Sequence, residues 1–189
     1  MLPLSIQKRF ESPGKLEQDF LNFLKRANAP IDQSKTIGYE VLYHSLLIGA
    51  TDKRDYFTGQ LNQFETNIRG SFVRPSSEHF VIYGIKGYYA KEVQKGFTSI
   101  NSFADDPDPV VINSSFSFLN NGIRVLRHVP LTEFDNENFM GDRGVIYLDQ
   151  PILWEGQEAI KLTISTNDPN TTFENIPRIR FDLVGLGLI

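Results

Sequence analysis

Three histidines are the side chains of this 189-residue chain best suited to acid–base or metal chemistry. They are His44, His79 and His128, and each lies in a segment that we predict to be a strand. A cupin-type metal site needs two histidines two residues apart with a carboxylate close behind, and no pair here has that spacing. We therefore interpret all three as hydrogen-bonded or partly exposed strand residues, with metal ligation as the alternative.

Two groups of acidic residues are the other candidates for a metal site. The stretch 105–108 holds three aspartates around one proline, and Asp135, Glu137 and Asp142 form the second group. Calcium accepts oxygen ligands of this kind on loops. Neither group has the spacing of a helix-loop-helix calcium site, so we expect structural loops and keep calcium binding as the alternative.

No motif for nucleophilic catalysis or nucleotide binding occurs in the sequence. The pattern G-x-S-x-G and the phosphate-binding pattern G-x-x-x-x-G-K-[ST] are both missing, and there is no cysteine. We therefore predict a protein that is not an enzyme and that takes no cofactor and no small-molecule substrate. A carboxylate pair for glycoside hydrolysis stays open, because such a pair is defined by its separation in space.

Aromatic residues make up 12% of an otherwise ordinary composition. The net charge of −4 argues against a protein built to wrap nucleic acid, and no apolar stretch approaches the roughly 18 residues of a membrane span. Most Phe and Tyr residues of the middle of the chain lie in predicted strands, whereas Trp154 is the single tryptophan. Sugar-stacking platforms usually carry more tryptophan, so core and subunit interface are the favoured uses, and Trp154 is a candidate interface residue.

Residues 1–30 predict an N-terminal arm and helix. Between Lys15 and Ala27 the apolar side chains recur at helical spacing and form one stripe. Pro13 suits the first helical position, and Asn28-Ala29-Pro30 is expected to end the helix. The apolar stripe supplies four further candidate interface residues: Leu16, Phe20, Phe23 and Leu24.

Residues 31–189 predict one domain of about eight strands. The strands do not alternate with helices, which argues against a doubly wound parallel sheet and favours an all-β antiparallel sandwich. Asn121-Gly122 predicts a tight hairpin. Eight strands fit a jelly roll, and we expect them over residues 39–48, 79–90, 110–119, 123–129, 145–148, 151–154, 160–165 and 179–189.

The succession of strand edges resembles a known family. The segment Phe80–Lys86 follows a loop that contains Pro75 and Ser76, the stretch 151–157 (Pro-Ile-Leu-Trp-Glu-Gly-Gln) leads into an alternating strand, and the chain closes on Ile-Arg-Phe-Asp-Leu-Val-Gly at 179–185. This order is similar to that of the jelly-roll capsid proteins of tailless icosahedral bacteriophages, including the lipid-containing ones. The similarity covers about Tyr39 to Ile189.

The resemblance implies a structural virion protein. The chain would be a single jelly-roll capsid subunit (major, minor or vertex) that is assembled in the host cytoplasm, associates with itself and with other capsid proteins, and resides in the virion. The N-terminal arm would reach a neighbouring subunit, an internal membrane or the packaged genome. Lys8 and Arg9 are the candidate contacts for the membrane or genome, and a solvated terminus is the alternative.

A non-catalytic carbohydrate-binding β-sandwich module, in a phage fibre or surface assembly, is the alternative function. It predicts an exposed aromatic patch near Trp154, or near Tyr88 and Tyr89, on which a sugar ring could stack.

Overall fold

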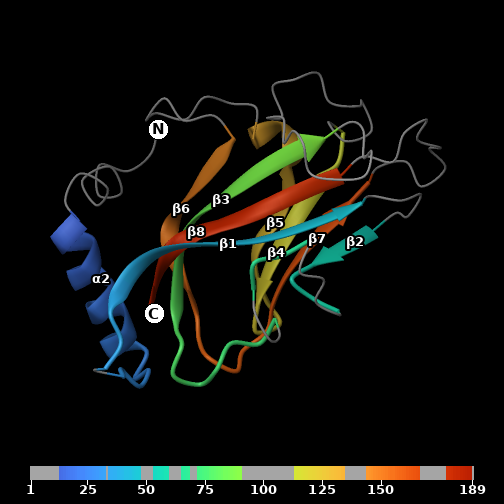
Figure 1. Cartoon of the computed structure of the whole chain (residues 1–189). Coiled ribbons are helices and arrows are strands. Elements are labelled where there is room, and N and C mark those ends of the chain that lie inside the picture. Colours follow the sequence, from blue (N-terminus) through green and yellow to red (C-terminus); the bar gives the residue numbers. More distant parts are fainter. Residues whose placement is uncertain are drawn as a thin grey trace.

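The computed structural model describes residues 13–32, 34–47, 53–59, 65–68, 72–90, 113–134, 144–166 and 178–188. Within these ranges, eight strands form two antiparallel four-stranded sheets, and one α-helix lies beside the first sheet (Figure 1). The predicted all-β class is therefore confirmed. The first sheet has the order β1 (Ile37–Leu47), β8 (Arg178–Leu188), β3 (Phe80–Ala90) and β6 (Val145–Trp154). The second has the order β2 (Lys53–Tyr56), β7 (Ile160–Ser165), β4 (Ser115–Asn120) and β5 (Ile123–Pro130).

Strand pairing links the two halves of the chain. The antiparallel pairs are β1 with β8, β2 with β7, β3 with β6, and β4 with β5. Two further pairings, β3 with β8 and β4 with β7, complete the sheets. The central hairpin turns at Asn121 and Gly122, whose φ angles of 46° and 75° are the left-handed values that a two-residue type I′ turn needs. The hairpin predicted from the sequence is confirmed.

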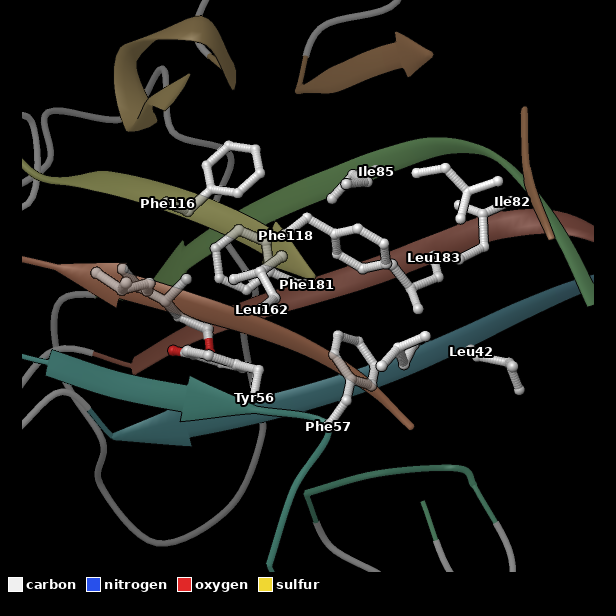
Figure 2. Packing of buried hydrophobic residues seen from close by; sticks show 14 of the residues in the cluster. Leu42, Tyr56, Phe57, Ile82, Ile85, Phe116, Phe118, Leu162, Phe181 and Leu183 are labelled. Carbon is white, nitrogen blue, oxygen red and sulfur yellow. The ribbon is translucent and has the colours of Figure 1, made fainter. Parts of the chain in front are cut away.

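The main hydrophobic core lies between the two sheets. Figure 2 shows Phe116 and Phe118 of β4 beside Phe181 and Leu183 of β8. The ring of Phe116 stacks on that of Phe134, which belongs to the short 3-10 helix η1 (Leu131–Phe134), with centroids 5.3 Å apart. Aromatic side chains bury large apolar areas, so these rings carry much of the core stabilisation. The predicted use of aromatic residues in the core is confirmed at these positions.

A second, smaller core lies between the first sheet and helix α2 (Pro13–Arg26). Phe20 and Leu24 of the helix are fully buried against strand side chains that include Val81 and Leu186. Strand β8 thus has apolar neighbours on both faces, which explains why its sequence from Leu183 to Leu188 shows no alternation with polar residues.

The helix ends where the sequence predicts. Asn28 has a φ of 53°, the N–H of Asn28 donates to the carbonyl of Lys25 (3.2 Å), and the N–H of Ala29 donates to the carbonyl of Leu24 (3.0 Å). These bonds form a Schellman motif, which satisfies carbonyls that the last helical turn leaves free. Lys25 and Arg26 lie in that turn, where the helix dipole favours positive charge. No described helix is long and apolar enough to cross a membrane.

Two strands differ from the prediction. The expected break at residues 149–150 is absent, because β6 runs without interruption from Val145 to Trp154. Its pairing with β3 is irregular instead: Ile82 lies opposite Ile152, whereas Gly84 lies opposite Tyr147. β6 is an edge strand of its sheet, which is where a strand tolerates a proline such as Pro151. The second difference is β2, an unpredicted edge strand whose sequence Lys-Arg-Asp-Tyr has no apolar alternation.

Candidate functional site

The four candidate residues on the helix divide into two pairs. Phe20 and Leu24 have no exposed surface, because both insert into the second core of the chain itself. Leu16 and Phe23 pack at the margin of that core and keep part of their surface exposed. With α2 packed on the first sheet, only Leu16 and Phe23 keep surface that a second chain could contact, and for these two the interface role remains a prediction. Residues 8 and 9, the expected contacts for genome or membrane, lie outside the described residues.

The structure corrects the expectation that Trp154 forms a subunit interface. Its side chain is fully buried at the end of β6, where the indole N–H donates to the carbonyl of Glu158 (2.9 Å). Tyr89 is also buried, so Trp154 and Tyr89 do not form the exposed aromatic patch expected for sugar binding. Tyr88 is partly buried, with the Lys86 ammonium 5.0 Å and the Arg180 guanidinium 5.5 Å from its ring centroid.

A charged cluster lies around Arg74, next to Trp154. The Arg74 guanidinium is 5.7 Å from the centroid of the indole ring, and its Nη1 and Nη2 atoms are both 3.3 Å from Oε2 of Glu40. The Nη2 atom is also 3.8 Å from Oε2 of Glu78, and Oε1 of the same carboxylate accepts a bond from Lys35 (3.0 Å). Arg74 is only 6% exposed, so this ion-pair network ties β1 to the segment before β3. Sequence patterns gave no sign of it.

His79 and His128 occupy different environments. The Nδ1 atom of His79 accepts from the N–H of Gly156 (3.2 Å), so its Nε2–H donates to the carbonyl of Pro30 (2.9 Å). His79 thereby joins the chain after the helix to the turn after β6. His128 is exposed in β5 with a φ of 46°, and its backbone N–H donates to Oγ of Ser117 (3.1 Å).

His44 is buried in β1 among aromatic side chains. Its Nδ1 atom accepts from the N–H of Phe57 (2.8 Å), and its ring lies 4.7 Å from that of Phe72, centroid to centroid. Burial is the main cause that lowers the pKa of His44 to about 4, and the positive charges of Arg54 and Arg178 contribute to the same shift. His44 is therefore neutral at pH 7 and accepts a structural hydrogen bond.

We expect the burial of His44 to make the fold sensitive to acid. The unfolded histidine gains a proton near pH 6.5, whereas the folded one does so only near pH 4. The contribution of His44 to the free energy of unfolding is therefore fully present above pH 6.5. It falls by about 2 to 3 kcal/mol as the pH drops toward 4. Urea unfolding of the wild type and a His44→Asn variant across this range should show the difference. In the control His128→Gln, the free energy of unfolding should depend on pH as it does in the wild type. The same pH dependence in His44→Asn would contradict the conclusion that His44 causes the sensitivity to acid.

The described residues hold no group of three histidines, cysteines or carboxylates that could bind a metal ion. The two acidic groups, at 105–108 and at 135, 137 and 142, lie outside the described residues, so calcium binding there remains a prediction.

A polar hollow of about 680 Å³ lies along the second sheet. Phe116, Phe118, Leu162 and Ile164 of β4 and β7 point into the main core, and the alternating residues between them line the hollow on the opposite face. Lining side chains include Lys53, Arg54, Asp55, Ser117, Arg124, His128, Lys161, Thr163 and Ser165, and the hollow extends to His44 and Leu46 of β1. These residues are scattered along the sequence, so only strand pairing brings them together.

The fold and these surfaces define a class: a two-sheet antiparallel β protein with a helix docked on one sheet and a polar hollow on the other. A comparison with protein-family models found no match for this chain, and a comparison with curated proteins found no similar sequence.

Proposed function

We propose that the chain is a structural virion protein, a single jelly-roll capsid subunit that assembles with copies of itself into an icosahedral shell. The observation that carries this proposal is the strand pairing. First pairs with eighth, second with seventh, third with sixth, and fourth with fifth. This pairing supports a jelly roll of the kind used by viral capsid domains, because a ribbon folded in half at its central hairpin and then rolled into two sheets would have it.

One fold can support several functions, so further observations are needed to favour a shell. The sequence resemblance to phage capsid proteins over Tyr39–Ile189 is the first. The second is an exposed apolar edge. Strand β5 is the last strand of the second sheet, and its side chains Ile123 and Val125 are 72% and 42% exposed. An edge strand with exposed apolar residues favours contact with another chain.

We place the contact between copies at this edge of the sandwich. A second copy is the occupant we propose because shell subunits associate through the sides of their sandwiches, where β5 is the edge strand among the described strands and offers apolar surface. Trp154 and Tyr89 are buried, so they offer no exposed ring on which a sugar could stack.

Aspartate at both Ile123 and Val125 is expected to abolish self-association and leave the thermal unfolding temperature nearly unchanged, because both side chains are exposed and the new charges would be buried at the contact. Sedimentation velocity compares the double variant with the wild type. Val73→Asp is the matched control. Val73 is 43% exposed and bridges Ala159 on the side of β7 away from β4 and β5, so its substitution should leave association intact. Unchanged association in the double variant would rule out β5 as the contact.

A further inference from the structure

The hollow on the second sheet is a positively charged site on a negatively charged protein. Four cationic side chains line it, from Lys53, Arg54, Arg124 and Lys161, whereas the chain as a whole carries a net charge of −4. A concave surface lined mainly by one sign of charge attracts ligands of the opposite sign.

The two acidic residues in the described lining, Asp55 and Glu65, are already engaged. Asp55 accepts from the hydroxyl of Thr163 (2.7 Å) and forms an ion pair with Lys161 (3.3 Å). Glu65 lies 3.5 Å from the guanidinium of Arg178. Lys53, Arg54 and Arg124, by contrast, form no salt bridge with any other residue that the structure describes. Among the described residues, these three are therefore the cations of the hollow to which we assign a ligand.

A row of hydroxyl groups runs through the same hollow. Ser117 of β4 lies directly opposite Thr163 of β7, and Ser165 follows two positions along β7 on the same face. Hydroxyls donate and accept hydrogen bonds, so they suit a ligand that is itself rich in hydroxyl groups. The described lining contains no Phe, Tyr or Trp, which leaves no platform for stacking a neutral sugar or a nucleic-acid base.

We propose that this hollow binds a small anionic sugar, either a sugar acid or a sugar phosphate. The shared chemistry is an oxyanion attached to a hydroxylated ring: Arg124 and Lys53 would hold the oxyanion, and Ser117 and Thr163 would face the ring hydroxyls. The volume of about 680 Å³ lies within the usual range for small-molecule sites. The proposal concerns a different surface from the β5 contact and does not depend on shell formation.

Isothermal titration at low salt, with the full-length protein and four probes, tests the proposal. The probes are glucuronate, glucose 6-phosphate, glucose and inorganic phosphate. We expect at least one anionic sugar to bind about tenfold or more tightly than both glucose and inorganic phosphate, a difference that needs the oxyanion and the ring together. Glucuronate alone would identify a carboxylate site, glucose 6-phosphate alone would identify a phosphate site, and either result supports the proposal.

Three variants that each remove one positive charge show whether binding occurs in the hollow. Arg124→Gln and Lys53→Gln should each weaken binding of the preferred sugar by about tenfold, the size expected for a lost charge-assisted contact. Arg127→Gln is the control, because Arg127 is exposed on the same strand as Arg124 but does not line the hollow; its affinity should stay within about twofold. The proposal is overturned if neither anionic sugar binds, if glucose or phosphate binds equally well, or if Arg127→Gln loses as much affinity as Arg124→Gln.

Discussion

Replacing Gly185 with alanine is expected to prevent the chain from folding. Gly185 lies in the middle of β8, paired with Glu40 of β1 and Ile82 of β3. A Cβ atom at this position would lie 2.0 Å from the carbonyl oxygen of Val81 and 2.9 Å from the ring of Phe80. The first obstacle is backbone, held in place by strand pairing on both sides, so no side-chain rotation can relieve it.

The irregular pairing of β3 accompanies this close approach. The register of β3 against β8 shifts between Ile82 and Gly84, next to the point where the Val81 carbonyl faces Gly185. We expect a loss of more than about 4 kcal/mol, a large fraction of the roughly 5 to 15 kcal/mol by which an ordinary domain is stable. Far-UV circular dichroism and soluble yield measure it. In the control Gly14→Ala, the new Cβ meets nothing within 4 Å and the helix gains up to about 1 kcal/mol. A Gly185→Ala protein that folds and melts like the wild type would contradict the account.

Replacing Trp154 with alanine should cost about 3 to 5 kcal/mol, the range for deleting a large buried aromatic side chain. The indole is fully buried, donates to the carbonyl of Glu158, and lies against the guanidinium of Arg74. Its removal would leave a cavity and also expose the Arg74 ion-pair network to water.

Urea unfolding followed by circular dichroism is the appropriate measurement, since the variant lacks the only tryptophan. The loss should be independent of protein concentration, because Trp154 stabilises the fold of each single chain. Ile123→Ala is the control: Ile123 is 72% exposed, so its truncation should change the stability by less than about 0.5 kcal/mol. The loss of unfolding free energy in Trp154→Ala could be as small as in the control, or could appear only at concentrations where copies associate. Either result would contradict the structural role of Trp154 and favour the interface role expected from the sequence.

Local patterns predicted the elements whose signals are local. The apolar stripe and the ending at Asn28 located helix α2, the pair Asn121-Gly122 located the central hairpin, and strict alternation located β7. Each of these depends on residues within a few positions of one another. The charged edge strand β2 buries little of its surface and therefore carries no alternating pattern that could reveal it.

The site features could not be predicted because they depend on distant residues. Arg74 is hydrogen-bonded to Glu40, which lies 34 positions away in the sequence, and Asp55 is hydrogen-bonded to Thr163, 108 positions away. Trp154 was given an interface role because the sequence shows that it is a rare aromatic residue but does not show what surrounds it. Predicting the hollow would have required the register of four strands, because Lys53, Arg124 and Lys161 look like isolated surface charges in the sequence.

Sedimentation velocity of the wild-type protein over a wide concentration range, together with negative-stain electron microscopy of the same samples, tests the capsid proposal most directly. The account predicts that oligomers grow with concentration and that the images contain closed, shell-like particles. A single monomer boundary at every concentration, with no particles in the images, would contradict it.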